Sequence, residues 1–153
     1  MKKYLKFLDA AFPFIATLFL WRMAIPVINP NGILAVIPIF YYGIVQNRSG
    51  FLPMAILGCF LLDYNFDTML FWTALFCAFY AGIGLQNFIN PATQKFHAIS
   101  IFMAFAGTGA ALLGLWTINY GLWAIIDMLW LFLISVIMYI PLTWLFQKAQ
   151  AHD

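Results

Sequence analysis

Few side chains in this sequence are suited to chemistry, and they do not combine into a reactive set. The 153 residues include five Asp, two His and two Cys, with no Glu. His97 and His152 stand in polar segments, and the chain has no HExxH, GxSxG, phosphate-binding loop or dinucleotide fingerprint. General acid–base or metal-assisted catalysis would lack its groups. The sequence therefore predicts a protein that is not an enzyme and that holds no cofactor or metal.

Four charged residues in or beside apolar runs are candidates for structural or binding roles. Arg22 lies about 20 Å along a helix from Asp9, too far to pair with it, so it is expected to reach the membrane interface or a carboxylate of Asp63, Asp67 or Asp127. Asp63 and Asp67 are four residues apart and form either a solvated loop or one helix face. Asp127 lies five residues inside the last apolar run, where a bond within the bundle is expected and contact with a partner is the alternative.

The composition excludes a soluble domain. Hydrophobic residues make up 65% of the chain and charged residues 8%, too few to build a water-facing surface. The net charge of +2 comes without a basic patch, which argues against binding of nucleic acid. Cys59 and Cys77 lie inside apolar runs without metal-ligand spacing, so we interpret them as packing residues.

Six apolar runs predict an all-α, polytopic integral membrane protein whose single domain, residues 1–153, is a compact bundle of six transmembrane helices. The runs cover about residues 7–27, 33–46, 51–62, 68–85, 98–117 and 122–146. The first run leads into Trp21 and Arg22 instead of a small-residue cleavage site, which favours a retained helix over a secretory signal. Fourteen helical residues reach about 21 Å against a hydrocarbon core of about 30 Å. The second and third helices are therefore extended by flanking residues or do not fully span.

The placement of basic residues favours six helices over five. With six crossings and a cytoplasmic N-terminus, the cytoplasmic side receives Lys2, Lys3, Lys6, Arg48, Lys95 and Lys148. A five-helix count would move Lys148 to the opposite side. We therefore expect both termini in the cytoplasm, with Arg48 at the tip of the hairpin formed by the second and third helices.

Two stripes of small residues predict a direct contact between the fourth and fifth helices, since helices in lipid associate by close packing. The first stripe is Ala74, Ala78 and Gly82, and the second is Ala106, Ala110 and Gly114. An alternative interpretation of residues 106–111 is an unwound substrate-binding segment of the kind found in transporters.

The segment from Ile37 to Ala81 resembles the central region of the MreD family of bacterial rod shape-determining membrane proteins. In that family an apolar helix ending in aromatic residues leads to a short turn with Arg and then to a helix closing on an Asp. Those places are occupied here by Tyr41, Tyr42, Arg48, Gly58 and Asp63. The chain length, the basic N-terminus and the final apolar helix followed by Lys148 agree with the resemblance.

The resemblance implies a non-catalytic scaffold subunit of the cell-elongation machinery in the bacterial inner membrane. Such a subunit would bind MreC and support a complex with MreB, a RodA-type glycosyltransferase and its transpeptidase. The alternative is the substrate-binding membrane subunit of a small-molecule uptake transporter, such as a vitamin-binding component, and a third possibility is a small membrane protein with a private partner. The transporter alternative requires an outer polar pocket, for which the sequence offers Arg22, Asn29, Asn31, Asp63, Asn65, Asp67, Asn119 and Asp127.

Overall fold

The computed structural model describes residues 2–46, 48–84 and 94–151, and these residues form helices and turns with no strand. In chain order the helical elements are α1 (Lys2–Arg22), η1 (Pro30–Ala35), α2 (Val36–Phe40), η2 (Tyr41–Val45), η3 (Ser49–Phe51), α3 (Leu52–Phe66), α4 (Phe71–Gly84), α5 (Gln94–Thr117), η5 (Ile118–Tyr120) and α6 (Leu122–Gln150). The all-α prediction is confirmed.

Each of the six predicted apolar runs forms a helical segment, but their lengths differ. Three described helices are long and apolar enough to cross a membrane: Lys2–Arg22, Ala98–Tyr120 and Leu122–Gln150. The segments Pro30–Val45, Leu52–Phe66 and Phe71–Ile83 are shorter. Several boundaries also differ from the prediction: α1 runs from Lys2 to Arg22 instead of over 7–27, α3 continues to Phe66, α5 begins at Gln94 instead of residue 98, and α6 continues to Gln150.

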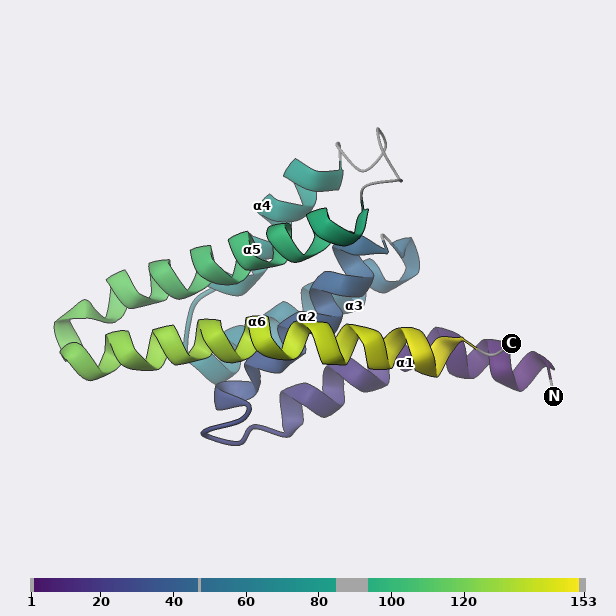
Figure 1. Ribbon diagram of the computed structural model, residues 1–153, viewed down its shortest axis with the longest axis horizontal. Coiled ribbons are helices and arrows are strands. Elements are labelled where there is room, and N and C mark those ends of the chain that lie inside the picture. The colour runs from purple at the N-terminus through teal and green to yellow at the C-terminus, as the bar shows by residue number, and fades with distance from the viewer. Residues whose placement is uncertain (1, 47, 85–93, 152–153) are drawn as a thin grey trace.

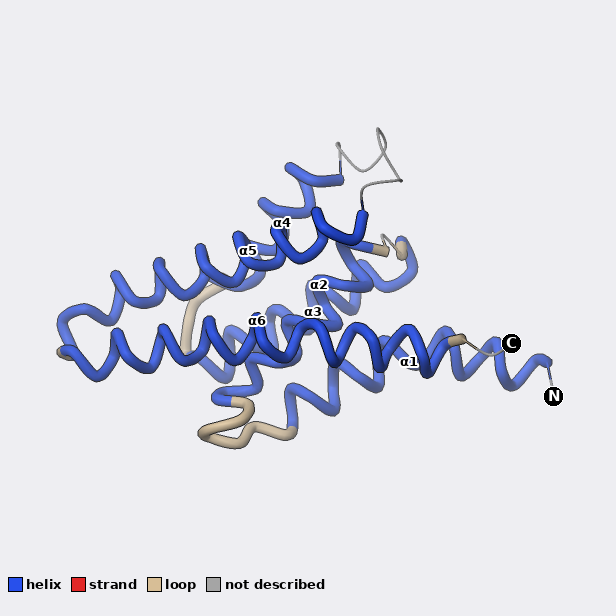
Figure 2. Tube along the Cα trace, viewed as in Figure 1, coloured by secondary structure: helices blue, strands red, loops and turns tan. Residues whose placement is uncertain are grey.

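The described segments run back and forth between two ends of the bundle (Figure 1). The N- and C-terminal ends lie together at one end, which we call the termini end. The opposite end, where η5 joins α5 to α6, is the hairpin end, and there the two long helices project beyond the others. The loops that follow α1 and α3 also lie toward the hairpin end (Figure 2). Consecutive segments therefore run in alternating directions.

The segment made of η1, α2 and η2 lies at the centre of the protein. All residues from 32 to 44 are buried, as expected of a helix that is apolar on every side. The ring of Phe40 contacts those of Phe102 and Phe105 on α5, with centroids 5.3 and 5.6 Å apart. Because neighbouring helices cover this segment, its length does not have to match the thickness of a bilayer.

The outer surface is apolar, which is typical of a protein in lipid. Large hydrophobic side chains are exposed along α1 and α6, among them Phe7, Leu129 and Ile137. Two exposed rings on α6, Trp123 and Trp144, lie about 31 Å apart at 1.5 Å per residue. This distance matches a hydrocarbon core of about 30 Å with aromatic rings at both interfaces.

The small-residue stripe of α5 packs on α6, not on α4 as the sequence predicted. Ala106 and Ala110 are buried. A Cβ atom added at Gly114 would lie 3.9 Å from Met128 of α6. The segment 106–111 is regular helix within α5, so the unwound alternative is wrong.

The stripe of α4 makes no such contact, because Ala74, Ala78 and Gly82 are exposed. No described atom lies within 4 Å of a Cβ atom added at Gly82. Helix α4 meets α5 through another face, where Trp72 and Phe79 contact Phe105 with centroids 6.1 and 5.2 Å apart. Large rings bury more area than alanine methyl groups, and this explains why α4 turns its aromatic face inward.

Candidate functional site

A cluster of polar side chains lies at the termini end and centres on Gln150. Its Oε1 accepts hydrogen bonds from the Tyr42 hydroxyl at 3.1 Å and from Arg48 Nη2 at 3.4 Å. Its Nε2 donates to the backbone carbonyl of Asp9 at 3.3 Å. In a regular helix the N–H of residue 13 would bond to this carbonyl, but residue 13 is Pro13, which has no N–H. Gln150 therefore joins α1, η2 and α6 in one contact.

The structure gives Arg48 a place within this cluster. Its guanidinium group lies over the Tyr42 ring, 5.1 Å from the centroid. The predicted site residue at the hairpin tip thus contacts the end of α6 and holds the turn against the bundle.

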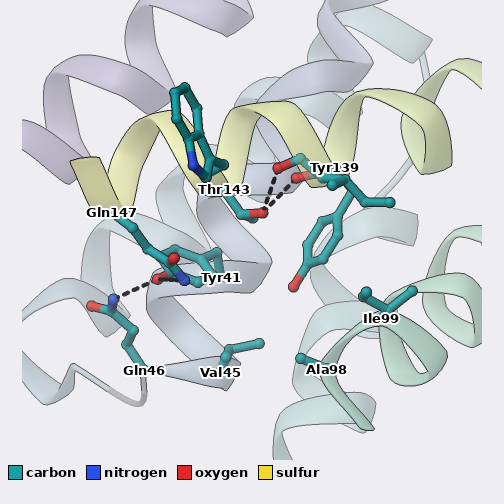
Figure 3. A pocket seen from close by; sticks show the side chains of 10 residues that line it. Tyr41, Val45, Gln46, Ala98, Ile99, Tyr139, Thr143 and Gln147 are labelled. Carbon is teal, nitrogen blue, oxygen red and sulfur yellow. Dashed lines mark hydrogen bonds between the residues drawn. The ribbon is translucent and has the colours of Figure 1, made fainter. Parts of the chain in front are cut away.

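A second set of polar groups surrounds the hydroxyl of Tyr41, close to this cluster. That oxygen accepts hydrogen bonds from Gln46 Nε2 at 2.9 Å and from Gln147 Nε2 at 3.2 Å. The Thr143 hydroxyl donates to the Tyr139 carbonyl at 2.7 Å, and Figure 3 shows these residues around one pocket.

This termini-end pocket has a volume of about 600 Å³, a size usual for small-molecule sites. It lies between η2, α6 and the beginning of α5 (Figure 3). Its lining residues are Tyr41, Val45, Gln46, Ala98, Ile99, Tyr139, Ile140, Thr143, Trp144 and Gln147. None of these described lining residues carries a charge, and polar and apolar side chains both contribute to the lining.

Asp63 is buried inside the protein, with 4% of its surface exposed. Its carboxylate accepts hydrogen bonds from the backbone N–H of Trp72 at 2.8 Å and of Thr73 at 3.3 Å, and from the hydroxyls of Thr68 and Thr73 at 2.9 and 3.0 Å. These two amides belong to the first turn of α4, whose N–H groups have no partner within the helix. The solvated-loop interpretation of Asp63 is wrong, because α3 continues through it and its carboxylate caps α4.

Asp67 and Arg22 lie toward the hairpin end and are exposed. Asp67 terminates α3 in the left-handed conformation, with φ 54°. It borders an apolar groove of about 690 Å³ between α4 and α5, whose wall includes Ala74 and Trp116. Arg22 lies in the last turn of α1, where a positive charge is favourable. Within the described residues it makes no ion pair with Asp63, Asp67 or Asp127.

Asp127 does not make the bond within the bundle that its sequence position suggested. It is exposed on α6 and has no hydrogen bond or ion pair within the described part of the chain. Leu131, Ser135 and Tyr139 form a buried face of α6. Asp127 lies on the same face, one turn before Leu131. The face becomes exposed at Asp127 because the hairpin end projects past the other helices (Figure 1).

Sequence reasoning missed two residues that hold helix ends together, Gln150 and Asn29. Asn29 is buried, and its Nδ2 donates to the carbonyls of Leu20 and Met23 at the end of α1, at 2.6 and 2.9 Å. Its Oδ1 accepts from the N–H of Leu34 at 2.9 Å. The turn composition of residues 29–32 pointed to this break in the helix, but nothing in it revealed that one amide serves both helix ends.

Residues 85–93, which include most of the connection between the predicted fourth and fifth helices, lie outside the described residues, as does His152. Of the cysteines, Cys59 is buried and Cys77 is exposed, and both are free. Among the described residues, no three His, Cys, Asp or Glu side chains gather as a metal site would require.

The chain matches no protein-family model, no curated protein and no solved structure.

Proposed function

We propose that the protein is a non-catalytic membrane scaffold subunit that binds another membrane protein through its helices. From the resemblance to the MreD family, we further propose that this partner is an MreC-like component of the bacterial cell-elongation machinery in the inner membrane. The observation that carries the proposal is the unpartnered carboxylate of Asp127.

A charged side chain within a membrane helix is expensive and normally finds a partner inside protein. Asp127 is flanked on α6 by the exposed apolar residues Ile126 and Leu129, and the described chain supplies it with no donor. It lies about 6 Å along the helix from Trp123, at the level expected for the outer part of the hydrocarbon. A basic or hydrogen-bonding side chain from a second membrane protein would satisfy it there.

The surfaces around the hairpin end suit a protein partner. The groove of about 690 Å³ between α4 and α5 is mostly apolar and is bordered by Asp67. The exposed small residues Ala74 and Ala78 continue this surface along α4 and would let the backbone of a partner helix approach closely. Packing and a few polar contacts are all that a scaffold subunit requires.

The uptake-transporter alternative receives less support, because three of the outer polar residues that it needs serve the protein's own backbone. Asn29 bonds to both helix ends, and Asp63 caps α4. Asn65 Nδ2 donates to the Asn31 carbonyl at 3.1 Å.

The test is extraction of the tagged protein from its native membrane in a mild detergent, followed by quantitative mass spectrometry of the proteins and small molecules that accompany it. We expect an elongation component with the unchanged chain and at least a tenfold smaller amount with Asp127→Leu. Ile137→Leu, a change on an exposed part of α6, serves as the matched control.

The abundance of folded Asp127→Leu distinguishes a docking role of Asp127 from a role in folding. Because Asp127 is exposed and makes no hydrogen bond or ion pair within the described chain, Asp127→Leu should accumulate to the level of the unchanged protein. A loss of folded Asp127→Leu would contradict the docking role, and recovery of an ATPase module or a bound metabolite would favour the transporter.

A further inference from the structure

The Tyr139 hydroxyl opens into the termini-end pocket and has no hydrogen-bond partner among the described residues. The residue is only 4% exposed, and its ring is fixed by stacking on Phe102, with centroids 4.3 Å apart. Figure 3 shows the hydroxyl pointing into the space between Val45, Ala98 and Ile99. No hydrogen bond to this oxygen is present within the described residues. The ring is buried while its hydroxyl opens into the pocket, so a molecule in the pocket could bond to this oxygen.

The pocket offers both donors and acceptors to a ligand. The Tyr41 oxygen already accepts two amide N–H groups, so its own proton is free to be donated. Gln46 and Gln147 each use Nε2 for that contact, which leaves their carbonyl oxygens available as acceptors. With the Tyr139 hydroxyl, these groups match a ligand that carries hydroxyls.

The lining indicates that the ligand is uncharged and partly hydrocarbon. None of the described lining residues is charged, so the walls themselves offer no countercharge to an ionic headgroup. Beside the polar groups, Val45, Ile99 and Ile140 supply apolar surface to the lining. Trp144, an exposed ring at the level expected for the membrane interface, borders the same pocket.

We propose that the termini-end pocket binds an amphipathic molecule with an uncharged, hydroxyl-bearing headgroup, such as the glycerol group of a monoacylglycerol, and that its hydrocarbon lies along Val45, Ile99 and Ile140. The headgroup oxygens accept from Tyr41 and Tyr139 and its hydroxyls donate to the two glutamine carbonyls. This site is separate from the Asp127 surface and does not depend on the function proposed for it.

The experiment uses the full chain in phosphatidylcholine nanodiscs with a mono-oleoylglycerol that carries a diazirine in its acyl chain. After irradiation, labelled peptides are mapped by mass spectrometry. We expect labels on the peptides that contain Val45, Ile99 and Ile140. Excess mono-oleoylglycerol should compete, whereas equimolar free glycerol and oleate should compete at least tenfold less well.

Two variants test the site itself. Tyr139→Phe keeps the stacked ring and removes only the unpartnered hydroxyl, so we expect about fivefold weaker labelling with an unchanged thermal midpoint. Ala98→Phe fills the pocket and should abolish labelling. Tyr120→Phe, an exposed tyrosine at the hairpin end, is the matched control and should label normally.

Three results would overturn the proposal. Labels spread evenly along α6 that Tyr139→Phe leaves unchanged would mean contact with bulk lipid only. Competition by oleate or phosphatidylglycerol as strong as by mono-oleoylglycerol would indicate an anion drawn by bases such as Lys148, whose Nζ lies 4.9 Å from the centre of the Trp144 ring. Equal competition by free glycerol would exclude a role for the hydrocarbon.

Discussion

Gln150 Nε2 donates a hydrogen bond of 3.3 Å to the backbone carbonyl of Asp9, and so joins the last helix to the first. Pro13 leaves that carbonyl without its usual helical donor. A free carbonyl facing lipid would cost several kcal/mol, because lipid offers it no hydrogen bond. The contact therefore compensates for a proline and closes the bundle at the termini end.

A double-mutant cycle tests this relationship. We expect Gln150→Ala to lower the free energy of unfolding in detergent micelles by about 2 kcal/mol, since it removes three hydrogen bonds. In a Pro13→Ala background, the new N–H at position 13 serves the Asp9 carbonyl, and the cost of Gln150→Ala should fall by about 1 kcal/mol. Equal costs in both backgrounds would contradict the proposed link to Pro13.

Because Asp63 caps α4, we expect its substitution to lower the free energy of unfolding much more than substitution of Asp67. Asp63→Ala removes a buried carboxylate that accepts four hydrogen bonds and should lower the free energy of unfolding by about 3 kcal/mol. Asp67→Asn is the control, because Asn tolerates the left-handed conformation and the side chain is exposed. Denaturant titration of both variants measures the difference, and similar losses would contradict the capping role.

One face of α4 packs on α5 and the other is exposed, so we expect an added methyl group to have opposite effects on stability at Gly109 of α5 and at Gly82 of α4. At Gly109 of α5 a Cβ atom would lie 2.9 Å from the Trp72 ring, so Gly109→Ala should destabilise the protein by about 1–3 kcal/mol. At Gly82 the added Cβ atom meets no described atom within 4 Å. Gly82→Ala should therefore be neutral or stabilising by up to about 1 kcal/mol through its higher helix propensity. Thermal melting measures both effects, and a marked loss with Gly82→Ala would mean that the α4 stripe packs within the chain.

We expect substitution of Asn29 to cause a local loss of structure between α1 and η1. Asn29→Ala removes three hydrogen bonds at a buried position and should cost about 2 kcal/mol. Asn119→Ala, at an exposed position in the turn between α5 and α6, should change stability by less than about 0.5 kcal/mol. Hydrogen exchange should rise in residues 20–34 of the Asn29 variant, and unchanged exchange there would be inconsistent with its bridging role.

Periodicity and composition were sufficient to predict the six helical segments, because each apolar run is bounded by turn residues such as those at 29–32 and 119–121. The shortness of the central segment was also visible in the sequence. The burial of residues 32–44 was not, since an apolar sequence looks alike whether protein or lipid covers the helix.

The candidate site was less accessible to sequence reasoning, because its contacts join residues far apart in the chain. Asp63 looked like a loop residue until its carboxylate was seen to cap a helix beginning eight positions later. Asp127 looked like an internal partner because it lies five residues inside an apolar run, and the face it shares with Leu131 is buried further along α6. Only the projection of the hairpin end beyond the other helices exposes it.

Site-specific photo-crosslinking next to Asp127 in native membranes tests the docking role most directly. A photoreactive residue at Ile126 leaves the carboxylate intact, and the same residue at Ile137 provides an exposed control on α6. We expect the probe at Ile126 to crosslink to one membrane protein and to lose that product with Asp127→Leu, while the probe at Ile137 gives lipid adducts. Lipid adducts alone at both positions, or a protein crosslink that Asp127→Leu leaves unchanged, would contradict the proposed function.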